Sequence, residues 1–457
     1  MKRFSYLFGT VCLMALLLMV GSAPSLAQNA DSSLPAPGFT LPDDTPKENK
    51  LAPLLVDLLK VYDKILAAKA RVSGSEHTVE AAWGQWYPQV DVSVEGGNEE
   101  RQRSLGQGTT SKLRNEQDLN INQLLWDFGK TNGLIARSAF LLKENEAALD
   151  QATQEALNQG VAAYLQCIRY WETLRYAIKS ENNIKELAGM EEAQVRKGAS
   201  LSYKELQIKA QLSGAQSYRV TVERALDNAR NRFRAMFLTS VERPEVATFA
   251  QPPMPMDDIP GSMDEAVNVA MDANPTLIQA EQTVKRTQSE LDIQNANFYP
   301  TLRLKGTGYR KEQDQGQIGV ETSNKITAEI RYNIFTGFTD LETSRALNQS
   351  VIEAKKLALD RRRTVEENVR NAWTDLTTNR KNAELYRIQS DITWEFLNLI
   401  KKKRLMGETV ELLDILIGER DYIQASSSAV TADIDTNIAA YTLLFQMGKM
   451  NLDMFTK

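Results

Sequence analysis

The chain of 457 residues contains a single histidine, His77, and two cysteines, Cys12 and Cys167. Such scarcity excludes a metal centre built from histidine and cysteine ligands. His77 lies in a polar helical stretch that offers no serine–histidine–aspartate triad. A glycine-rich phosphate loop of the G-x-x-x-x-G-K-S/T type is also missing, so any source of energy must lie in a partner. The sequence therefore predicts a protein that is not an enzyme and carries no cofactor or metal.

The chain also lacks a basic stripe with interleaved aromatic residues, and its formal net charge is −5. These features argue against nucleic-acid binding. Because Cys12 lies inside the first apolar stretch, Cys167 has no partner for an internal disulfide. Its position within a helical pattern predicts an inert, small hydrophobic side chain rather than a reactive thiol.

Residues 1–27 have the three parts of a secretory signal peptide. Lys2-Arg3 is the positive start, residues 11–20 form a short apolar core, and Ser25-Leu26-Ala27 supplies small residues before an expected cut at Gln28. An uncleaved anchor is the alternative, but the apolar run is too short to span a hydrocarbon core of ~30 Å. No later segment approaches a membrane helix, so we expect an exported protein.

Proline is missing from two long parts of the chain, residues 89–243 and 301–457. Each of these parts opens in the same way, with Trp86-Tyr87-Pro88 before the first and Phe298-Tyr299-Pro300 before the second. The likeness continues further along, where Leu125–Gly129 parallels Ile334–Phe338 and Lys197-Gly198 parallels Met406-Gly407. The chain is therefore interpreted as two copies of one unit.

The duplication divides the chain after the signal peptide into four parts. Proline-rich and aspartate-rich composition predicts a poorly ordered leader, and clustered prolines predict an extended linker between the copies. The expected parts are the leader at 28–50, the first structural repeat at 51–242, the linker at 243–261 and the second structural repeat at 262–457.

Apolar and polar residues alternate after each Tyr-Pro pair, as they do in strands whose two faces differ. Ile326-Thr327-Ala328 begins this pattern in the second copy, and Val90, Val92 and Val94 begin it in the first. A turn containing Gly, Ser, Thr or Asn separates the strands of each pair. We predict one antiparallel hairpin per copy, at about 89–127 and about 301–335.

Helical periodicity then returns and continues over unusually long stretches, at about 130–238 and about 338–450. Ile168, Trp171 and Leu174 mark one apolar stripe of this kind. Ordinary helices average about 11–12 residues, so elements of this length favour coiled-coil packing. A long helix followed by a glycine reversal and a second helix is expected in each copy.

Four strands per chain cannot close a membrane sheet, because unpaired edge groups are not tolerated in lipid. Membrane barrels need about eight strands or more, so two or three chains are the smallest solutions. Aromatic residues at the hairpin feet are typical of a membrane-interface girdle, with plain core packing at the helix–strand joint as the alternative. They are Trp86, Tyr87, Trp126, Phe128, Phe298, Tyr299, Tyr332 and Phe335.

The segment Met263–Pro275, followed by Tyr299-Pro300, the hairpin and the proline-free helix, resembles the repeat opening of the TolC family of outer-membrane efflux and secretion channels. The resemblance implies a mainly α-helical fold with a transmembrane β-barrel, in which the helix–β-hairpin–long-helix–helix unit is duplicated. It further implies a homotrimer, with a twelve-stranded barrel in outer-membrane lipid on a long periplasmic α-barrel. One departure is visible: the first copy has Tyr62-Asp63 in place of Asn274-Pro275, so no bend is expected in its opening helix.

In the family, the helix reversals at Gly198 and Gly407 would be periplasmic tips that meet a membrane-fusion adaptor joined to an inner-membrane ABC or proton-driven transporter. Both glycines suit a tight reversal, and simple helix caps are the alternative. Glu411 and Asp414 are three residues apart, which predicts one helix face, and they resemble the family's pore-constriction carboxylates. A solvated helix face is their alternative interpretation.

The function expected from this resemblance is a passive outer-membrane exit duct with a long periplasmic portion. Absence of a lipid-bearing cysteine and the strand end Leu125–Gly129 favour type I protein secretion, and the outer-membrane part of a small-molecule efflux pump is the alternative. A periplasmic coiled-coil adaptor would explain the helices but not the duplicated hairpins. A surface adhesive protein would need polar repeats or an anchoring segment, and neither is evident.

Overall fold

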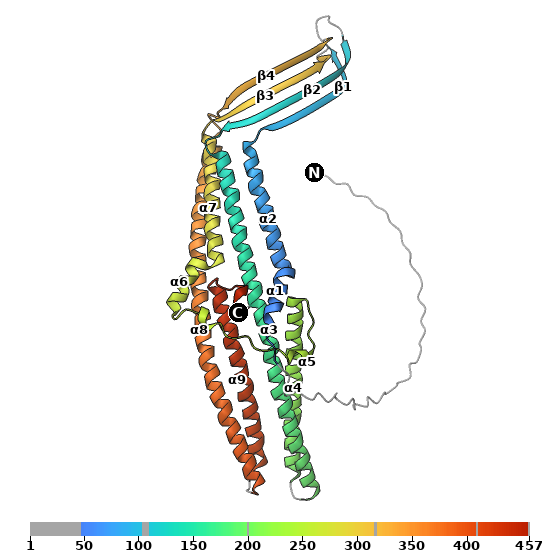
Figure 1. Ribbon diagram of the computed structural model, residues 1–457, viewed down its shortest axis with the longest axis vertical. Coiled ribbons are helices and arrows are strands. Elements are labelled where there is room, and N and C mark those ends of the chain that lie inside the picture. The colour runs from blue at the N-terminus through green and yellow to red at the C-terminus, as the bar shows by residue number, and fades with distance from the viewer. Residues whose placement is uncertain (1–46, 103–108, 199–200, 315–317, 408–409, 456–457) are drawn as a thin grey trace, which may run out of the picture. The chain divides into compact units, whose positions relative to one another are not determined.

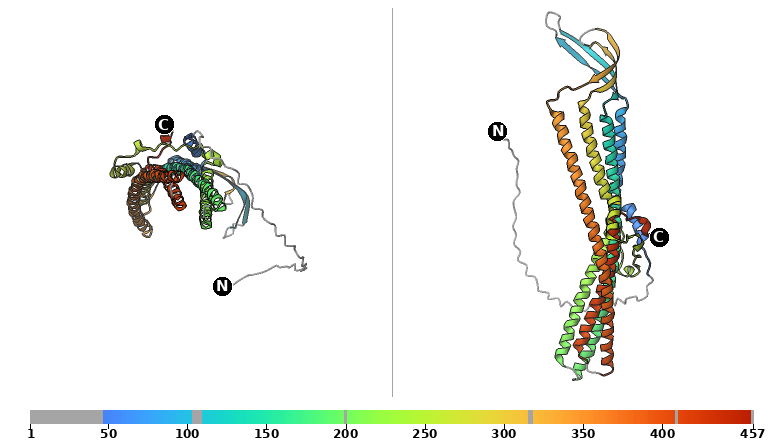
Figure 2. Two further views of the ribbon diagram at one scale, coloured as in Figure 1. Left: turned by 90° about the horizontal axis from the view of Figure 1, so that it is seen from below. Right: turned by 90° about the vertical axis from the view of Figure 1, so that its left-hand side faces the viewer.

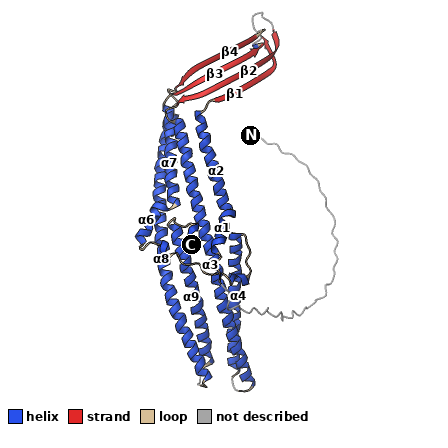
Figure 3. Ribbon diagram, viewed as in Figure 1, coloured by secondary structure: helices blue, strands red, loops and turns tan. Residues whose placement is uncertain are grey.

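The computed structural model describes residues 47–102, 109–198, 201–314, 318–407 and 410–455. The expected signal peptide at 1–27 and leader residues 28–46 lie outside the described residues, as do the outermost parts of both hairpin turns. Residues 45–457 form one unit, and all elements described below belong to it. Long helices and one small sheet make up this unit (Figures 1 and 3).

The elements of the first half are α1 (Leu51–Val61), α2 (Asp63–Trp83), η1 (Gly84–Trp86), β1 (Gln89–Gln102), β2 (Thr109–Trp126), α3 (Lys130–Arg196), α4 (Ser202–Phe237), α5 (Arg243–Val246) and η2 (Met256–Asp258). Those of the second half are α6 (Met263–Ala273), α7 (Pro275–Asn295), η3 (Ala296–Phe298), β3 (Thr301–Glu312), β4 (Val320–Arg331), α8 (Thr339–Leu405), α9 (Leu412–Gln446) and η5 (Leu452–Phe455). The order from α1 to α4 thus recurs from α6 to α9, and α3 and α8 are each 67 residues long.

Both opening helices are broken at the same point, and the expectation for the first copy was wrong. In the second copy the Asn274 side chain caps α7, accepting from the Thr276 N–H at 2.9 Å. Tyr62 also leaves the helical region, with ψ of 115°, although no proline follows it. Packing supplies the cause, because Leu55 lies so close to Gly160 of α3 that a Cβ there would be 2.9 Å from its Cδ2. Tertiary contacts of α1 therefore override the local helix preference of the sequence.

The four strands form one antiparallel sheet in the order β1-β2-β3-β4, so β1 and β4 are its edges. Val90 pairs with Ile121, Ile121 with Gly306, and Gly306 with Ile326, which fixes the register across the whole sheet. The ladder between β2 and β3 shifts between Leu124 and Trp126, at the end next to α3. This bulge adjusts the strand where the chain turns into the helix.

The helices pack in rows in which α3 is central. It contacts α2, α7, α4 and α9, while α8 packs along both α7 and α9 (Figure 2). One buried apolar cluster joins α6, α7, α8 and α9 through residues that include Leu277, Val369 and Leu443. A second joins α3, α4 and α9 through Ile184, Ile208 and Leu416, and apolar side chains at helical spacing form both.

The proline-rich segment between the two halves is held against the helices by its backbone carbonyls. Asn437 Nδ2 donates to the Pro252 carbonyl at 3.0 Å, and the Tyr441 hydroxyl donates to the Pro253 carbonyl at 3.0 Å. The Tyr164 hydroxyl donates to the Ala250 carbonyl at 2.9 Å. These bonds satisfy polar groups that the prolines prevent from pairing in regular structure. Within the described residues, none of the helices combines the length and the hydropathy required to cross a membrane.

Candidate functional site

The two faces of the sheet differ in chemistry over the half next to the helices, whereas further out Gln117, Arg310 and Asn324 share the face of Val94. The register places Val90, Val92 and Val94 on one face, and their side chains are 58%, 72% and 69% exposed. On β4 the same face carries Ile326 and Ile330, which are 80% and 72% exposed. Members from the inner strands are Leu119, Ile121, Leu302 and Leu304. A contiguous apolar patch of this kind on a protein surface marks contact with lipid or with another protein.

The opposite face is mainly polar, with Leu124 and Tyr309 among its members. Glu116 is buried there against Arg114 and Lys311, and Arg114 Nε lies 3.1 Å from a carboxylate oxygen of Asp314. The remaining polar-face residues include Asp91, Ser93, Glu95, Asp118, Asn120, Asn122, Arg303, Lys305, Thr307, Glu321, Ser323, Lys325, Thr327, Glu329 and Arg331. A sheet that is apolar on one face and charged on the other can separate lipid from water.

Some of the aromatic residues expected at the hairpin feet contact one another, and the others lie separately on the surface. The rings of Phe128 and Tyr299 stack with centroids 5.3 Å apart, which joins the two hairpins, and Trp126 meets Phe128 edge-on at 6.2 Å. Both Tyr87 and Phe335 are mainly exposed, at 68% and 72%. Tyr332 and Phe298 are also exposed, and Trp86 is half-buried in η1.

Two exposed aromatic residues at the same joints escaped the sequence reasoning. Trp83 ends α2 and is 53% exposed, and Phe338 precedes α8, is 65% exposed and meets Phe335 edge-on at 5.3 Å. Phe338 aligns with Gly129 in the repeat, and both residues adopt positive φ, of 66° and 95°. The signal that could have found Phe338 is its place immediately after Phe335-Thr336-Gly337.

Gly198 and Gly407 lie at the two helix reversals, as the sequence indicated. Their φ angles are 71° and 84°, in the left-handed region that glycine adopts readily. The Gly198 N–H donates to the Val195 carbonyl at 2.9 Å, and the Gly407 N–H donates to the Arg404 carbonyl at 3.2 Å. Residues 199–200 and 408–409 lie outside the described part of the chain.

The expected common helix face of Glu411 and Asp414 is incorrect. Glu411 has ψ of 141° and precedes α9, whereas Asp414 lies in its first turn. The Asp414 N–H donates to the Glu411 carbonyl at 3.2 Å, so the two residues remain close through the backbone. Both side chains are exposed, and the position of Asp414 suits the positive end of the helix dipole.

Exposed apolar residues also surround these reversals, and the sequence reasoning did not single them out. Leu201, Tyr203 and Leu206 at the start of α4 are 59%, 60% and 68% exposed, and Met406 is 71% exposed. Exposed apolar residues gathered at one end of a helix pair are typical of surfaces that contact a partner.

A buried carboxylate links three of the four helices that approach the reversals. Glu419 of α9 is fully buried, accepts a short hydrogen bond from Asn183 of α3, and pairs with Lys401 of α8 at 2.9 Å. Glu191 of α3, also buried, lies 3.8 Å from Arg404 of α8. These polar contacts were not predicted, because the sequence pattern does not reveal which carboxylates packing will bury.

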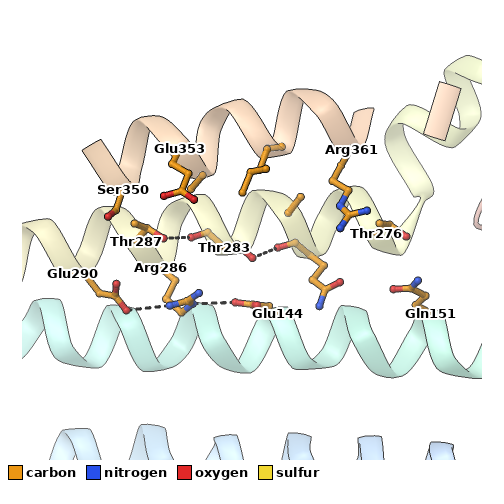
Figure 4. Close-up of a pocket in the computed structure, with 15 residues that line it drawn as sticks. Glu144, Gln151, Thr276, Thr283, Arg286, Thr287, Glu290, Ser350, Glu353 and Arg361 are labelled. Atoms are coloured by element: carbon orange, nitrogen blue, oxygen red, sulfur yellow. Dashed lines mark hydrogen bonds and ion pairs between the residues drawn. The ribbon is translucent and has the colours of Figure 1, made fainter. Parts of the chain in front are cut away.

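A polar cavity of about 550 Å³ lies between α3, α7 and α8 (Figure 4). Arg286 of α7 crosses it, donating to Glu144 of α3 at 3.0 Å and to Glu290 at 3.0 Å. Ser350, Glu353 and Arg361 of α8 line the facing wall. The described lining residues include no histidine or cysteine, and the ion pairs join neighbouring helices as structural contacts do.

The groups that could suggest catalysis are placed unfavourably for it. Burial raises the pKa of the Cys167 thiol to about 12, which makes it a poor nucleophile. His77 is exposed on α2, and its Nδ1 lies 3.4 Å from Glu80. Among the described residues, no three histidine, cysteine, aspartate or glutamate side chains gather closely enough to hold a metal ion.

Residues 54–237 and 266–449 match the family model for outer membrane efflux proteins. The chain belongs to the outer membrane efflux protein family. The outer membrane is therefore its location, and the family is one of transport components. The sequence predicted a channel of the TolC family, and the family match confirms this prediction.

Individual relatives are distant in sequence and match three quarters or more of this chain. Outer membrane efflux protein BepC of Brucella suis biovar 1 (strain 1330) is 21% identical, covering 91% of this chain and 89% of that protein. Protein CyaE of Bordetella pertussis is 21% identical, covering 77% and 74%. The Campylobacter jejuni CmeC outer membrane channel superposes with a TM-score of 0.76 at 14% identity, covering 95% and 96%. The CusC structure gives 0.77 at 14% identity, covering 90% and 96%, so the mainly helical fold with a small sheet is that of these channels.

Proposed function

We propose that this protein is the outer-membrane exit duct of a tripartite export system, formed by three copies of the chain. Each copy, a duplicated helix–hairpin–long-helix–helix unit, would contribute β1 to β4 to a twelve-stranded barrel. The helices would form a long periplasmic tube. Conduction would be passive. The observation that supports this most directly is the four-stranded sheet with an exposed apolar face, a charged opposite face and two open edges.

A second apolar surface supports assembly outside the lipid. α8 carries a stripe at helical spacing, Leu385, Ile388, Ile392, Phe396 and Leu399, whose side chains are at least 50% exposed in the single chain. Leaving such a stripe in water is unfavourable, and burying the exposed half of each side chain would contribute roughly 1 kcal/mol. A neighbouring copy would cover it.

The aromatic residues at the hairpin feet would lie at the membrane interface. The reversals at Gly198 and Gly407, with the exposed Leu201 and Met406 beside them, would contact the periplasmic membrane-fusion adaptor. Carboxylates Glu411 and Asp414 from each copy would surround one axis and narrow the entrance. Their mutual repulsion would be relieved by cations, which favours cation passage.

Type I protein secretion with an inner-membrane ABC transporter is the proposed use of the duct. The absence of a lipid-bearing cysteine and the Leu125–Gly129 strand end support it. Small-molecule efflux, with an ABC or proton-driven transporter, is the second candidate, because the Brucella relative is named an efflux protein. Crosslinking in cells, followed by identification of the co-purified adaptor and transporter, would decide between the two.

Purified mature protein in planar bilayers tests the duct itself. We expect discrete passive pores from a detergent-extracted trimer. The double variant Glu411→Ala/Asp414→Ala should change conductance, cation selectivity and divalent-ion block. The matched double variant Glu76→Ala/Glu80→Ala removes two exposed carboxylates of α2 and should leave all three unchanged. A monomeric, water-soluble protein without pores would overturn the proposal, and unchanged conduction in the first variant would reject the constriction alone.

A further inference from the structure

Charged residues on the polar face of the sheet are segregated by hairpin. From the helix end out to the row that joins Glu95 to Glu321, every charged side chain of the first hairpin on this face is acidic, namely Asp91, Glu95, Glu116 and Asp118. Over the same rows the second hairpin carries mainly basic side chains, which are Arg303, Lys305, Lys311, Lys325 and Arg331, beside the acids Glu321 and Glu329. The polar face therefore has an acidic stripe on β1 and β2 and a basic stripe on β3 and β4.

Some of these charges pair inside the chain. Lys305 and Arg331 both pair with Glu329 within the basic stripe. Several other members of the two stripes take part in no ion pair among the described residues, and these are Asp91, Glu95, Asp118, Arg303 and Lys325. Their charges are therefore available to a molecule that lies against this face.

The dimensions of the stripes suit an extended polypeptide. The basic stripe follows β4 from Lys325 to Arg331, which is a length of ~20 Å. Neighbouring strands lie ~4.8 Å apart, so the midlines of adjacent hairpins are ~10 Å apart. In an extended segment, next-but-one residues point to the same side and are ~7 Å apart. A segment with charges of both signs can thus set a carboxylate over the basic stripe while its ammonium group meets the acidic stripe.

We infer that this face contacts extended polypeptide segments that carry charges of both signs, with the acidic stripe binding their basic groups and the basic stripe binding their carboxylates. The inference rests on the proposed function, in which the polar face lines the duct, and it names the class of passenger. Charge complementarity is the observation that carries it. In a ring of copies the two stripes would alternate around the whole wall.

The opposite signs of the stripes have a consequence for small ions. Because the stripes largely offset one another, the wall alone should favour neither cations nor anions. A variant that weakens one stripe leaves the other in excess, and the excess charge concentrates ions of the opposite sign. Such charges act over ~10 Å at 0.1 M salt and over only ~3 Å at 1 M.

Variants of the full-length protein in planar bilayers test the stripes. Asp91→Asn/Asp118→Asn weakens the acidic stripe, Arg303→Gln/Lys325→Gln weakens the basic stripe, and a quadruple variant combines the four changes. Arg310→Gln is the matched control, because it removes a charge of β3 from the opposite face of the sheet.

The first measurement is the ratio of potassium to chloride permeability. At ~0.1 M salt this ratio should fall about 1.5-fold or more in the acidic-stripe variant and rise by a similar factor in the basic-stripe variant. The quadruple variant and Arg310→Gln should keep the wild-type ratio, and all differences should disappear at ~1 M salt. Wild-type ratios in both double variants would overturn the inference, because the stripes would then lie outside the conducting path.

A peptide probe separates passenger contact from ion selectivity. The probe is a soluble peptide in which glutamate and lysine alternate between glycines, added on the side of the sheet. It should interrupt the wild-type current, and each interruption should be about threefold or more shorter in the quadruple variant, which lacks several exposed charge pairs. Equal interruption times in the wild-type and quadruple proteins would overturn the proposed contact.

Assembly of each variant is measured first, as the fraction recovered as an oligomer in outer membranes. Where a double variant does not assemble, Asp118→Asn or Arg303→Gln on the inner strands replaces it, with the same expected direction. A wild-type protein without pores would overturn the proposed duct itself. Pores whose selectivity and block are independent of the stripes would overturn this inference alone, so the two failures are distinguishable.

Discussion

Lys401 Nζ of α8 lies 2.9 Å from a carboxylate oxygen of Glu419 of α9, whose side chain is completely buried. Asn183 of α3 donates to the other oxygen of the same carboxylate. A buried carboxylate is stable only when it is paired and hydrogen-bonded, because removing an ion from water is costly. One glutamate therefore ties together three of the four helices that lead to the reversals.

Lys401→Met should destabilise this region strongly, since it leaves the Glu419 charge buried without its lysine partner. We expect a loss of about 2 kcal/mol, reduced from the fully buried case because Lys401 is 38% exposed. Thermal unfolding of the detergent-purified protein measures the effect. Lys402→Met, at an exposed neighbouring position, is the matched control, and Lys401→Met/Glu419→Gln should recover part of the loss. Equal melting temperatures for the Lys401→Met and Lys402→Met variants would contradict this role of Lys401.

The mainly helical fold with a small sheet was predicted from the sequence because local patterns encode it. Proline-free stretches with apolar residues at helical spacing gave the helices, and alternation after Tyr87-Pro88 indicated strands. The break at Tyr62 was not predicted, because it depends on how Leu55 packs against Gly160 rather than on a local breaker. Burial of Glu419 is likewise a property of three helices, and no single stretch of sequence contains it.

The candidate site could be predicted only in part, because some of its features depend on tertiary packing and on where helices begin. Gly198 and Gly407 were identified because positive φ favours one residue type, and both adopt it. Glu411 and Asp414 were assigned one helix face from spacing alone, but α9 begins after Glu411. Spacing indicates a shared face only where both residues are helical, and helix ends are poorly fixed by sequence.

Gly407→Ala should loosen the second reversal, because alanine in a left-handed conformation costs about 1–2 kcal/mol. Peptides that span the reversal should exchange amide hydrogens about fivefold faster or more. Gly407→Asn should have a smaller effect, since asparagine tolerates this conformation better. Gly189→Ala is the control, because Gly189 lies inside α3 with nothing within 4 Å of an added Cβ. The Gly189→Ala variant should exchange its amide hydrogens at the wild-type rate or more slowly. Faster exchange in this control would show that the effect of Gly407→Ala does not come from the positive φ at Gly407.

Cys167 should not react with a thiol reagent in the folded protein. Burial raises its thiol pKa to about 12, so at pH 8 almost no thiolate is present, and no surface is open to the reagent. Met190→Cys places a thiol on the same helix at a position where the native side chain is 48% exposed. Mass spectrometry should find the new cysteine labelled within minutes and Cys167 labelled only after denaturation. Labelling of both at similar rates would mean that this part of α3 opens in solution.

The two faces of the sheet give the sharpest test of membrane placement, because neighbouring residues of one strand point to opposite faces. Ile326 is 80% exposed on the apolar face, and Thr327 lies next to it on the polar face. Arginine on the lipid face costs roughly 2–4 kcal/mol near the bilayer midplane, whereas arginine on a water-filled face is tolerated. The closed ring would incur this cost once per copy, so a single substitution acts on the whole assembly.

Ile326→Arg should therefore reduce the fraction of chain recovered as a heat-modifiable oligomer in outer membranes, while Thr327→Arg should leave that fraction near the wild-type level. Both variants add the same charge to the same strand, so a general effect of arginine on folding would lower both equally. Such an equal loss would contradict the assignment of lipid to the apolar face. The reverse order, with Thr327→Arg the more harmful, would assign lipid to the charged face and is incompatible with the buried Glu116–Lys311 pair on that face.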